Sequence, residues 1–261
     1  MGLLSGKTAL IFGVANDKSI AYGIAKKLKE HGAEIALSYA GAVLEKRVLP
    51  IADELGVKFC QECDLTDDIA IEALFEKIKK EFVQFDILVH SVAFAPKEAL
   101  TGRYIDTARA AFITTMNISV YSLLAVAKHA EPLMRENGSI ITMTYYGGEK
   151  VVKNYNVMGV AKSALDSTVR YLAVDLGASK SIRVNAISAG PVKTLAASGI
   201  SSFSSVFPVI NETAPLRRPI DIDDCGGAAV YLASDLSKNV TGEVLHVDSG
   251  FNIIGLYGAG K

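Results

Sequence analysis

The sequence has no surplus of either charge, because 28 acidic residues face 27 basic ones along 261 positions. Proteins that bind nucleic acid by electrostatic attraction usually carry a basic surplus, and acidic tails mark another class of interaction protein. Both features are missing. We therefore expect no nucleic-acid partner. At this length the chain fits one α/β domain better than two small ones.

Cysteine is also scarce, with only Cys60, Cys63 and Cys225 present. An odd, small number fits a reducing compartment rather than a disulfide framework. The pair Cys60 and Cys63 has C-x-x-C spacing, but it follows an apolar strand pattern instead of opening a helix, and no second ligand pair follows. The four histidines are scattered, at His31, His90, His129 and His246. None has a ligand neighbour at helical spacing, so we expect no metal site.

Targeting and membrane-spanning patterns are missing as well. Met1 to Phe12 lacks the basic and long apolar regions of a secretory signal and instead predicts a first strand. The uncharged run Thr194–Asn211 contains Pro208 and four serines within five positions, Ser201, Ser202, Ser204 and Ser205, which excludes an apolar spanning helix there. We expect a soluble, cytoplasmic protein without a membrane partner.

Strand-like apolar runs alternate with helical patterns along the whole chain. The predicted strands are Lys7–Phe12, Glu34–Ser38, Val57–Gln61, Asp86–His90, Ser139–Thr144, Ile182–Ser188 and Glu243–Val247. The predicted helices are about Ser19–His31, Leu44–Leu55, Asp67–Phe82, Thr107–Arg135, Tyr155–Leu176 and Asp221–Asp235. Alternation of this kind produces parallel strands with right-handed crossovers, and near-continuous apolar strands indicate helices on both faces.

We therefore expect an α/β fold: a single doubly wound Rossmann-type domain over residues 1–261, with a seven-stranded parallel sheet. The segment from about 195 to 218 is the least regular, and its Gly, Ser and Pro content indicates a substrate-binding lid with short helices. Its first part, Leu195–Val209, is expected to be mobile when empty and ordered by cofactor and substrate.

The usual dinucleotide motif G-x-G-x-x-G is absent after the first strand. Gly13, Ser19 and Ala21 supply small residues in its place, so that backbone N–H groups and a helix N-terminus can approach a pyrophosphate. A plain strand–loop–helix turn with a serine cap explains the same residues. The position at the first crossover of a doubly wound pattern favours the cofactor interpretation, as do Asp64 and Val92 at the ends of later strands.

The end of the second strand lacks both an acid and a base. An acid at Ser38-Tyr39-Ala40-Gly41 would bind both ribose hydroxyls, and an Arg or Lys would bind a 2′-phosphate. Lys46 and Arg47 come later, in the next predicted helix. We expect NADH rather than NADPH.

A phenol and an ammonium group stand seven residues apart at Tyr155 and Lys162, in a predicted helix. Seven residues are close to two helical turns, so both side chains share one face. A nearby lysine favours the phenolate and strengthens the phenol as a donor. Beside a nucleotide fold this pair indicates hydride chemistry on an oxygen-bearing substrate, although packing and solvated charge explain most such pairs.

The sequence resembles the bacterial enoyl-acyl carrier protein reductases, within the short-chain dehydrogenase/reductase superfamily. The resemblance spans essentially the whole chain, and the segments that carry it are Gly13 with Ser19–Gly23, Tyr145, Tyr155–Lys162, Ser188–Gly199 and Gly242–Asp248. An ordinary short-chain dehydrogenase has Tyr-x3-Lys and a partner Ser. Here those positions hold Met158 and Tyr145, so the ketone-reducing pair is absent.

The resemblance implies reduction of the 2,3 double bond of trans-2-enoyl-acyl carrier protein thioesters, the last reductive step of each fatty acid elongation cycle. It implies catalytic Tyr145, Tyr155 and Lys162. It implies cofactor contacts at Gly13, Ser19, Ile20, Asp64, Leu65, Val92, Lys162, Val192 and Thr194, and an acyl pocket at Ala95, Met158 and Phe203. It also implies a homotetramer built on the long helices and the final strand region. Two alternatives are a 3-oxoacyl (carbonyl) reductase and a non-catalytic NAD-binding sensor.

Overall fold

The structure, a computed structural model, describes residues 2–194 and 206–255. Seven parallel strands form one sheet in the order β3-β2-β1-β4-β5-β6-β7. The strands are β1 Thr8–Phe12, β2 Glu34–Tyr39, β3 Phe59–Glu62, β4 Phe85–His90, β5 Met134–Thr144, β6 Arg183–Ala189 and β7 Val244–Val247. The predicted doubly wound α/β fold and the seven predicted strands are confirmed.

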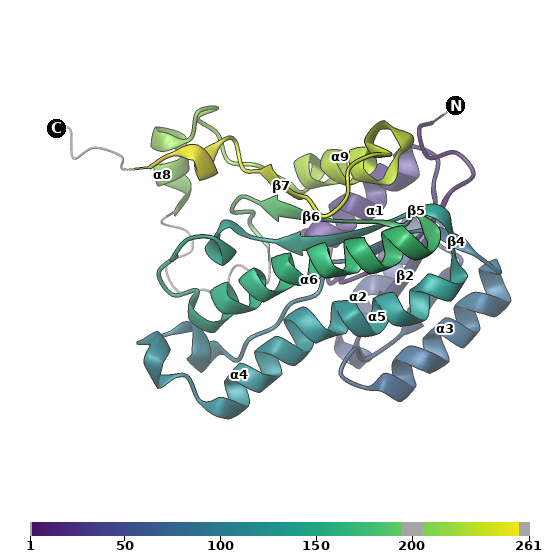
Figure 1. The fold of residues 1–261 in the computed structure, drawn as a ribbon, viewed down its shortest axis with the longest axis horizontal. Coiled ribbons are helices and arrows are strands. Elements are labelled where there is room, and N and C mark those ends of the chain that lie inside the picture. Colours follow the sequence, from purple (N-terminus) through teal and green to yellow (C-terminus); the bar gives the residue numbers. More distant parts are fainter. Residues whose placement is uncertain (1, 195–205, 256–261) are drawn as a thin grey trace.

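Helices cover both faces of this sheet (Figure 1). The described helices are α1 Ile20–Glu30, α2 Gly41–Glu54, α3 Asp68–Phe82, α4 Arg109–Met116, α5 Ser122–Ala130, α6 Asn156–Lys180, α8 Val206–Thr213 and α9 Ile222–Ala233. The helices α3, α5 and α6 lie on one face, and α1, α2 and α9 lie on the other. Several begin at side-chain caps that the sequence supplies, such as Ser19 before α1 and Asp221 before α9.

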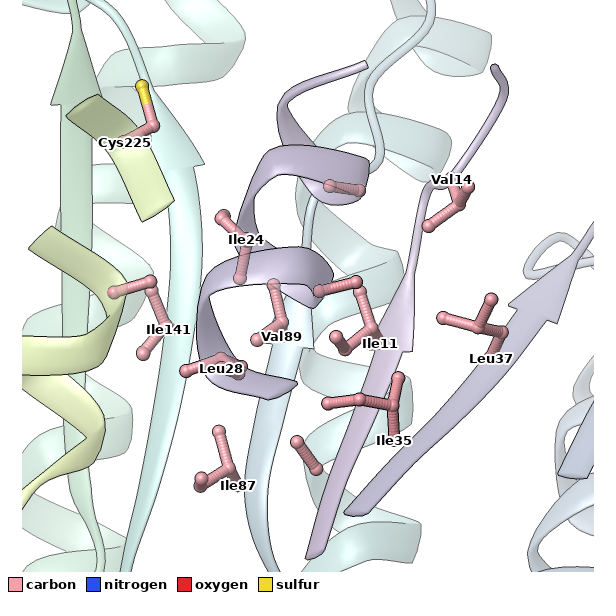
Figure 2. Packing of buried hydrophobic residues seen from close by; sticks show 14 of the residues in the cluster. Ile11, Val14, Ile24, Leu28, Ile35, Leu37, Ile87, Val89, Ile141 and Cys225 are labelled. Atoms are coloured by element: carbon pink, nitrogen blue, oxygen red, sulfur yellow. The ribbon is translucent and has the colours of Figure 1, made fainter. Parts of the chain in front are cut away.

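The period of two along each strand divides the core into two layers. In β1, Ala9 and Ile11 pack towards α1 and α9, whereas Leu10 and Phe12 pack towards α3 and α6. Figure 2 shows the first layer, where strand side chains such as Ile11 gather around Ile24 of α1. Because helices cover both faces, strands without polar alternation bury both sets of side chains.

The long helix predicted for Thr107–Arg135 is interrupted. A π-helical turn, Asn117–Tyr121, separates α4 from α5, and the helix gives way to a short 3-10 turn that ends at Leu133. Arg135, predicted to be helical, lies in β5 instead, because β5 starts at Met134 and pairs there with Phe85. Segment 109–133 is long and apolar enough to span a bilayer, but half of its most apolar window is buried against the rest of the protein.

The sheet reverses its winding between β1 and β4, because β2 and β3 extend from one side of β1 and the later strands extend from the other. In open α/β sheets, ligands bind beyond the carboxyl ends of the strands at such a switch point. The predicted lid lies partly outside the described residues, and its described part contains α8.

Candidate active site

A cavity of about 420 Å³ opens at the switch point, in the size range of small-molecule sites. Its walls come from the segments that follow β1, β2, β3 and β4. Seven of the predicted cofactor residues line it: Gly13, Ser19, Ile20, Asp64, Leu65, Val92 and Thr194. The cavity is therefore built where the strand ends converge, as the sequence predicted for these residues.

Gly13 allows two strand ends to approach closely beside this cavity. Its φ is +102°, and a Cβ atom there would stand 2.1 Å from the carbonyl oxygen of Ser91. Only glycine fits such a contact in that backbone conformation. Ser19 then starts α1: its hydroxyl donates to the Asn16 carbonyl at 2.7 Å and accepts from the Tyr22 N–H. The loop therefore presents backbone groups and a helix N-terminus to the cavity.

Polar groups at the ends of β2 and β3 shape the end of the cavity opposite the loop that follows β1. Tyr39 and Ala40 line the cavity, and the Tyr39 hydroxyl donates to Oε1 of Glu45 at 3.1 Å. The hydroxyl of Ser38, which also lines the cavity, is buried without a hydrogen-bond partner among the described residues. Asp64 accepts from the N–H and the hydroxyl of Thr66, so it holds its own turn as well as facing the cavity.

The predicted reacting groups form a separate apolar cluster beside the cavity. Tyr145 and Tyr155 meet edge to face with ring centroids 5.0 Å apart, and Met158 and Ala95 belong to the same cluster. Ala95 follows Phe94, which lines the cavity, so the two regions are joined along the chain. The structure thus brings four of the predicted catalytic and acyl-pocket residues together. Phe203 lies outside the described residues.

Lys162 is 6% exposed on α6, and its Nζ donates to the Met143 carbonyl at 2.7 Å. Burial lowers the pKa of Lys162 to about 8, and the charge of Asp166 opposes that shift. Lys162 and Val192 do not border the described cavity; Val192 is buried in the core layer under α1. Their predicted cofactor contacts remain predictions.

The expectation that lysine favours a phenolate at Tyr155 is wrong for this structure. Burial, followed by the electrostatic effects of Tyr145 and Asp166, raises the pKa of Tyr155 far above its ordinary value. Desolvation outweighs any attraction to an ammonium group two turns away. The hydroxyl therefore stays protonated near neutral pH and is available as a hydrogen-bond donor.

A clamp that sequence reasoning missed fixes one wall of the cavity. The hydroxyl of Ser119, in the π-helical turn, donates to the Phe94 carbonyl at 3.1 Å and accepts from the Phe94 N–H at 3.0 Å. Its neighbour Ile118 lines the cavity directly, and Ser122 donates to the Ile118 carbonyl. Helical periodicity gives no signal for a π-helical turn, so these contacts were not predictable.

His90 is completely buried as a neutral side chain. Its Nδ1 lies 3.1 Å from Oγ1 of Thr142 and its Nε2 lies 2.8 Å from Oγ of Ser122. Burial, with the charge of Lys162, lowers the pKa of His90 to about 3. Burial also raises the pKa of Cys60 to about 11 and of Cys63 to about 12, which argues against reactive thiolates. No metal-binding cluster occurs among residues 2–194 and 206–255.

A family model described as enoyl-(acyl carrier protein) reductase matches residues 13–252, which include every residue that lines the cavity except Phe12, and the tyrosine cluster. The chain belongs to the enoyl-(acyl carrier protein) reductase family. A relative in this family from Rhizobium meliloti (strain 1021), named enoyl-[acyl-carrier-protein] reductase [NADH] 1, is 55% identical over 98% of this chain and 93% of its own length. The resemblance seen in the sequence is confirmed.

Two solved structures of this family are similar over nearly the whole chain. The enoyl-acyl carrier protein reductase of Bacillus cereus, in complex with NADP+ and indole naphthyridinone, is 50% identical and has a TM-score of 0.96, with 98% of this chain and 100% of that chain covered. The corresponding reductase of Anaplasma phagocytophilum, in complex with NAD, is 49% identical with a TM-score of 0.93, covering 99% and 96%. Both relatives hold a nicotinamide cofactor.

Proposed function

We propose that the chain is an NADH-dependent enoyl-[acyl-carrier-protein] reductase, which reduces the 2,3 double bond of trans-2-enoyl thioesters in fatty acid elongation. The observation that carries this proposal is the packed pair of the partly buried Tyr145 and the buried Tyr155, with Tyr155 rather than residue 158 as the phenol nearest Lys162 along the helix. A ketone-reducing enzyme of the superfamily would need Tyr at 158 and Ser at 145. Met158 and Tyr145 stand there instead.

The residues present fit a dinucleotide. Gly13 has no Cβ to block the pyrophosphate, the capped start of α1 offers N–H groups, and the unpartnered Ser38 hydroxyl borders the adenosine end. Gly13, Ser19, Ile20, Asp64, Leu65, Val92, Val192 and Thr194 are the proposed contacts. When bound, the reduced nicotinamide supplies the hydride that reaches the β-carbon of the substrate.

Tyr155 is the group that stabilises negative charge on the substrate. As the β-carbon gains hydride, charge moves to the thioester oxygen, and the protonated Tyr155 hydroxyl donates a hydrogen bond to that enolate. Such preorganised donors typically contribute about 3–4 kcal/mol in the transition state. Burial supports the role, since the 8% exposed Tyr155 does not have to break bonds with bulk water first. Protonation of the α-carbon completes the reduction.

Lys162 and Tyr145 support this step. Lys162 leaves or shares its bond with the Met143 carbonyl to hold the nicotinamide ribose, and its charge favours electron density on the substrate oxygen. Tyr145 packs edge to face on Tyr155 and fixes the direction of its ring. Ala95, Met158 and Phe203 are the proposed walls of the acyl pocket, and the lid predicted at about 195–218 is its proposed cover; Phe203 lies outside the described residues.

The substrate partner is the acyl carrier protein, and the proposed assembly is a homotetramer acting in the cytoplasm. An exposed apolar face supports self-association: Ile113 and Leu124 on α4 and α5 are 58% and 45% exposed, and Tyr171 and Val174 on α6 are 75% and 71% exposed. A hollow between the two helical segments, lined by Met116, Tyr121 and Thr168 among others, continues this face. A second copy of the chain would cover it.

The test is a spectrophotometric assay of NADH consumption with crotonyl or longer enoyl thioesters, run in parallel with NADPH. We expect NADH to be consumed in proportion to saturated product. Consumption with a 3-oxoacyl substrate and none with an enoyl substrate would instead identify a carbonyl reductase. Cofactor binding without any turnover would identify a sensor.

A further inference from the structure

We propose that Asp166 is a positioning residue for the reaction, which keeps Lys162 charged and aimed at the cofactor from beneath the active site. This inference rests on the proposed function of Lys162. Asp166 follows Lys162 by four residues on α6, so one helical turn separates the two side chains on the same face. Neither belongs to the cavity wall.

Both side chains are buried, with exposed fractions of 7% for Asp166 and 6% for Lys162. Buried charges are rare unless they are paired, because the interior solvates them poorly. The two groups make no salt bridge within 4 Å, since the lysine Nζ donates to the Met143 carbonyl instead. The carboxylate therefore acts on the ammonium group through its charge rather than through a direct ion pair.

The carboxylate itself is held without its full set of partners. Oδ1 of Asp166 and Oγ1 of the neighbouring Thr144 are both buried without a well-formed hydrogen bond among the described residues. Buried polar atoms in folded proteins are nearly always satisfied, and exceptions concentrate where function requires them. The Thr144 side chain and the charge of Lys162 both favour the ionised form of Asp166 and oppose the effect of burial on its pKa.

A close-packed turn seals this pair from solvent. At Gly148 an added Cβ would stand 3.1 Å from Oδ2 of Asp166 and 3.0 Å from the backbone carbon of Lys162. These distances are tighter than ordinary van der Waals contact, so a side chain at this position would require the turn or α6 to shift by a few tenths of an ångström. The seal lowers the local dielectric constant, which strengthens the interaction between the two charges.

Four further charged or titratable groups act on this pair. Glu149, whose Oε1 lies 2.6 Å from Nε2 of His246, and Arg170 act on Asp166, with opposite signs. His90, which stays neutral, faces Lys162 from β4, and Tyr155 lies two turns before it on the helix. These groups are unchanged in the variants below.

The sign of the effect follows from the two pKa shifts. Burial lowers the pKa of Lys162 to about 8, and the negative charge of Asp166 raises it. Burial raises the pKa of Asp166, while the charge of Lys162 lowers it. Removal of the carboxylate charge leaves only the desolvation of Lys162, so its pKa falls further. Lys162 then loses its positive charge at a lower pH, and at that pH its contact with the cofactor ribose is lost as well.

The decisive measurement is the dissociation constant of NADH, from its fluorescence on binding, as a function of pH for wild type and Asp166→Asn. We expect wild type and Asp166→Asn to bind NADH equally well at about pH 6. Both should lose affinity as the pH rises, and the midpoint of that loss should lie about one pH unit lower in the variant. Asp175→Asn, an exposed acid on the same helix, serves as the matched control and should follow the wild-type curve.

Two further variants separate positioning from simple structural support. In a Lys162→Met background, Asp166→Asn should cause no additional shift, because the group on which it acts is gone. Asp166→Glu, which keeps the charge, should restore most of the wild-type midpoint. A loss of affinity that is equal at every pH would overturn the proposal in favour of a structural role, and an unchanged curve would overturn it outright.

Failure of the proposed function gives a different result. If wild type binds NADH but reduces no enoyl thioester, the function is wrong, while the pH curves still report on Asp166 and Lys162. If wild type turns over normally and Asp166→Asn shows no shift, only the positioning role is wrong. Thermal unfolding of each variant shows whether it is folded before binding is measured.

Discussion

At the scale of single residues, the environment of Tyr155 decides its chemistry more than its neighbour Lys162 does. Burial keeps the phenol protonated, and the edge-to-face contact with Tyr145 fixes its ring. A protonated hydroxyl in a fixed direction is suited to hydrogen-bond an enolate oxygen rather than to act as a base. Tyr155 should therefore matter for the chemical step and hardly at all for cofactor binding.

We expect Tyr155→Phe to lower kcat by about 100-fold or more, as loss of a preorganised oxyanion donor does, with the NADH dissociation constant nearly unchanged. Steady-state kinetics with an enoyl thioester and a direct binding measurement test both parts. Tyr104→Phe, on an exposed 3-10 turn, is the control. Unchanged turnover in Tyr155→Phe, together with a large loss in Tyr145→Phe, would reverse the two assigned roles.

A second prediction at this scale concerns the preference for NADH. Tyr39 lines the cavity and donates to Glu45, which brings a carboxylate close to the place where an NADPH 2′-phosphate would lie. Like charges about 4 Å apart in a largely aqueous environment repel by about 1 kcal/mol. We expect Glu45→Gln to raise the NADPH to NADH ratio of kcat/KM about fivefold.

Glu54→Gln provides the matched control for this variant. Glu54 lies on the same helix and also accepts from a tyrosine hydroxyl, that of Tyr22 at 3.0 Å, but neither residue lines the cavity. Measuring kcat/KM with NADH and with NADPH for both variants tests this prediction. An equal change in both variants would mean that the helix, not the carboxylate beside the cavity, sets the preference.

At the scale of elements, the strand pattern was sufficient to predict the fold, and the strand ends with the Ser19 cap indicated where the cavity lies. The end of β1, the cap at Ser19 and the small residues near Val92 are local features, and the switch point brings them together through topology alone. Contacts that depend on an irregular helix could not be predicted from the sequence. The clamp of Ser119 on Phe94 depends on the π-helical turn, and the strand at Arg135 depends on pairing with a distant residue, Phe85.

Helix caps allow the structural and functional parts of one element to be separated. Ser19 caps α1 at the cavity, and Asp221 caps α9 away from the cavity by accepting from the N–H groups of Asp223 and Asp224. Removal of either cap should lower the free energy of unfolding by about 1 kcal/mol. Only Ser19→Ala should also weaken NADH binding, because of these two helix starts only that of α1 lines the cavity.

Chemical denaturation and NADH titration of Ser19→Ala and Asp221→Ala check this prediction. Denaturation with an unchanged slope confirms that both variants retain the native fold before affinities are compared. An equal loss of affinity in the two variants would show that general destabilisation, rather than the α1 start, explains the effect.

At the scale of the whole molecule, one chain leaves an apolar face uncovered on α4, α5 and α6. Ile113, Leu124, Tyr171 and Val174 stay exposed although their helices are packed on their inner sides. Large exposed apolar patches mark interaction sites, and covering one with a second copy removes its cost in water. The same face explains why segment 109–133 is apolar enough to pass as a membrane span.

We expect Ile113→Glu combined with Tyr171→Glu to dissociate the proposed tetramer into smaller species, as sedimentation velocity would show. Ile69→Glu is the control, because Ile69 is 77% exposed on α3 and lies outside the apolar face. NADH binding should survive in the dissociated form, since residues of a single chain build the cavity. A double variant that sediments like wild type would exclude this face from the assembly, and loss of binding on dissociation would mean that the assembly itself holds the cofactor site in shape.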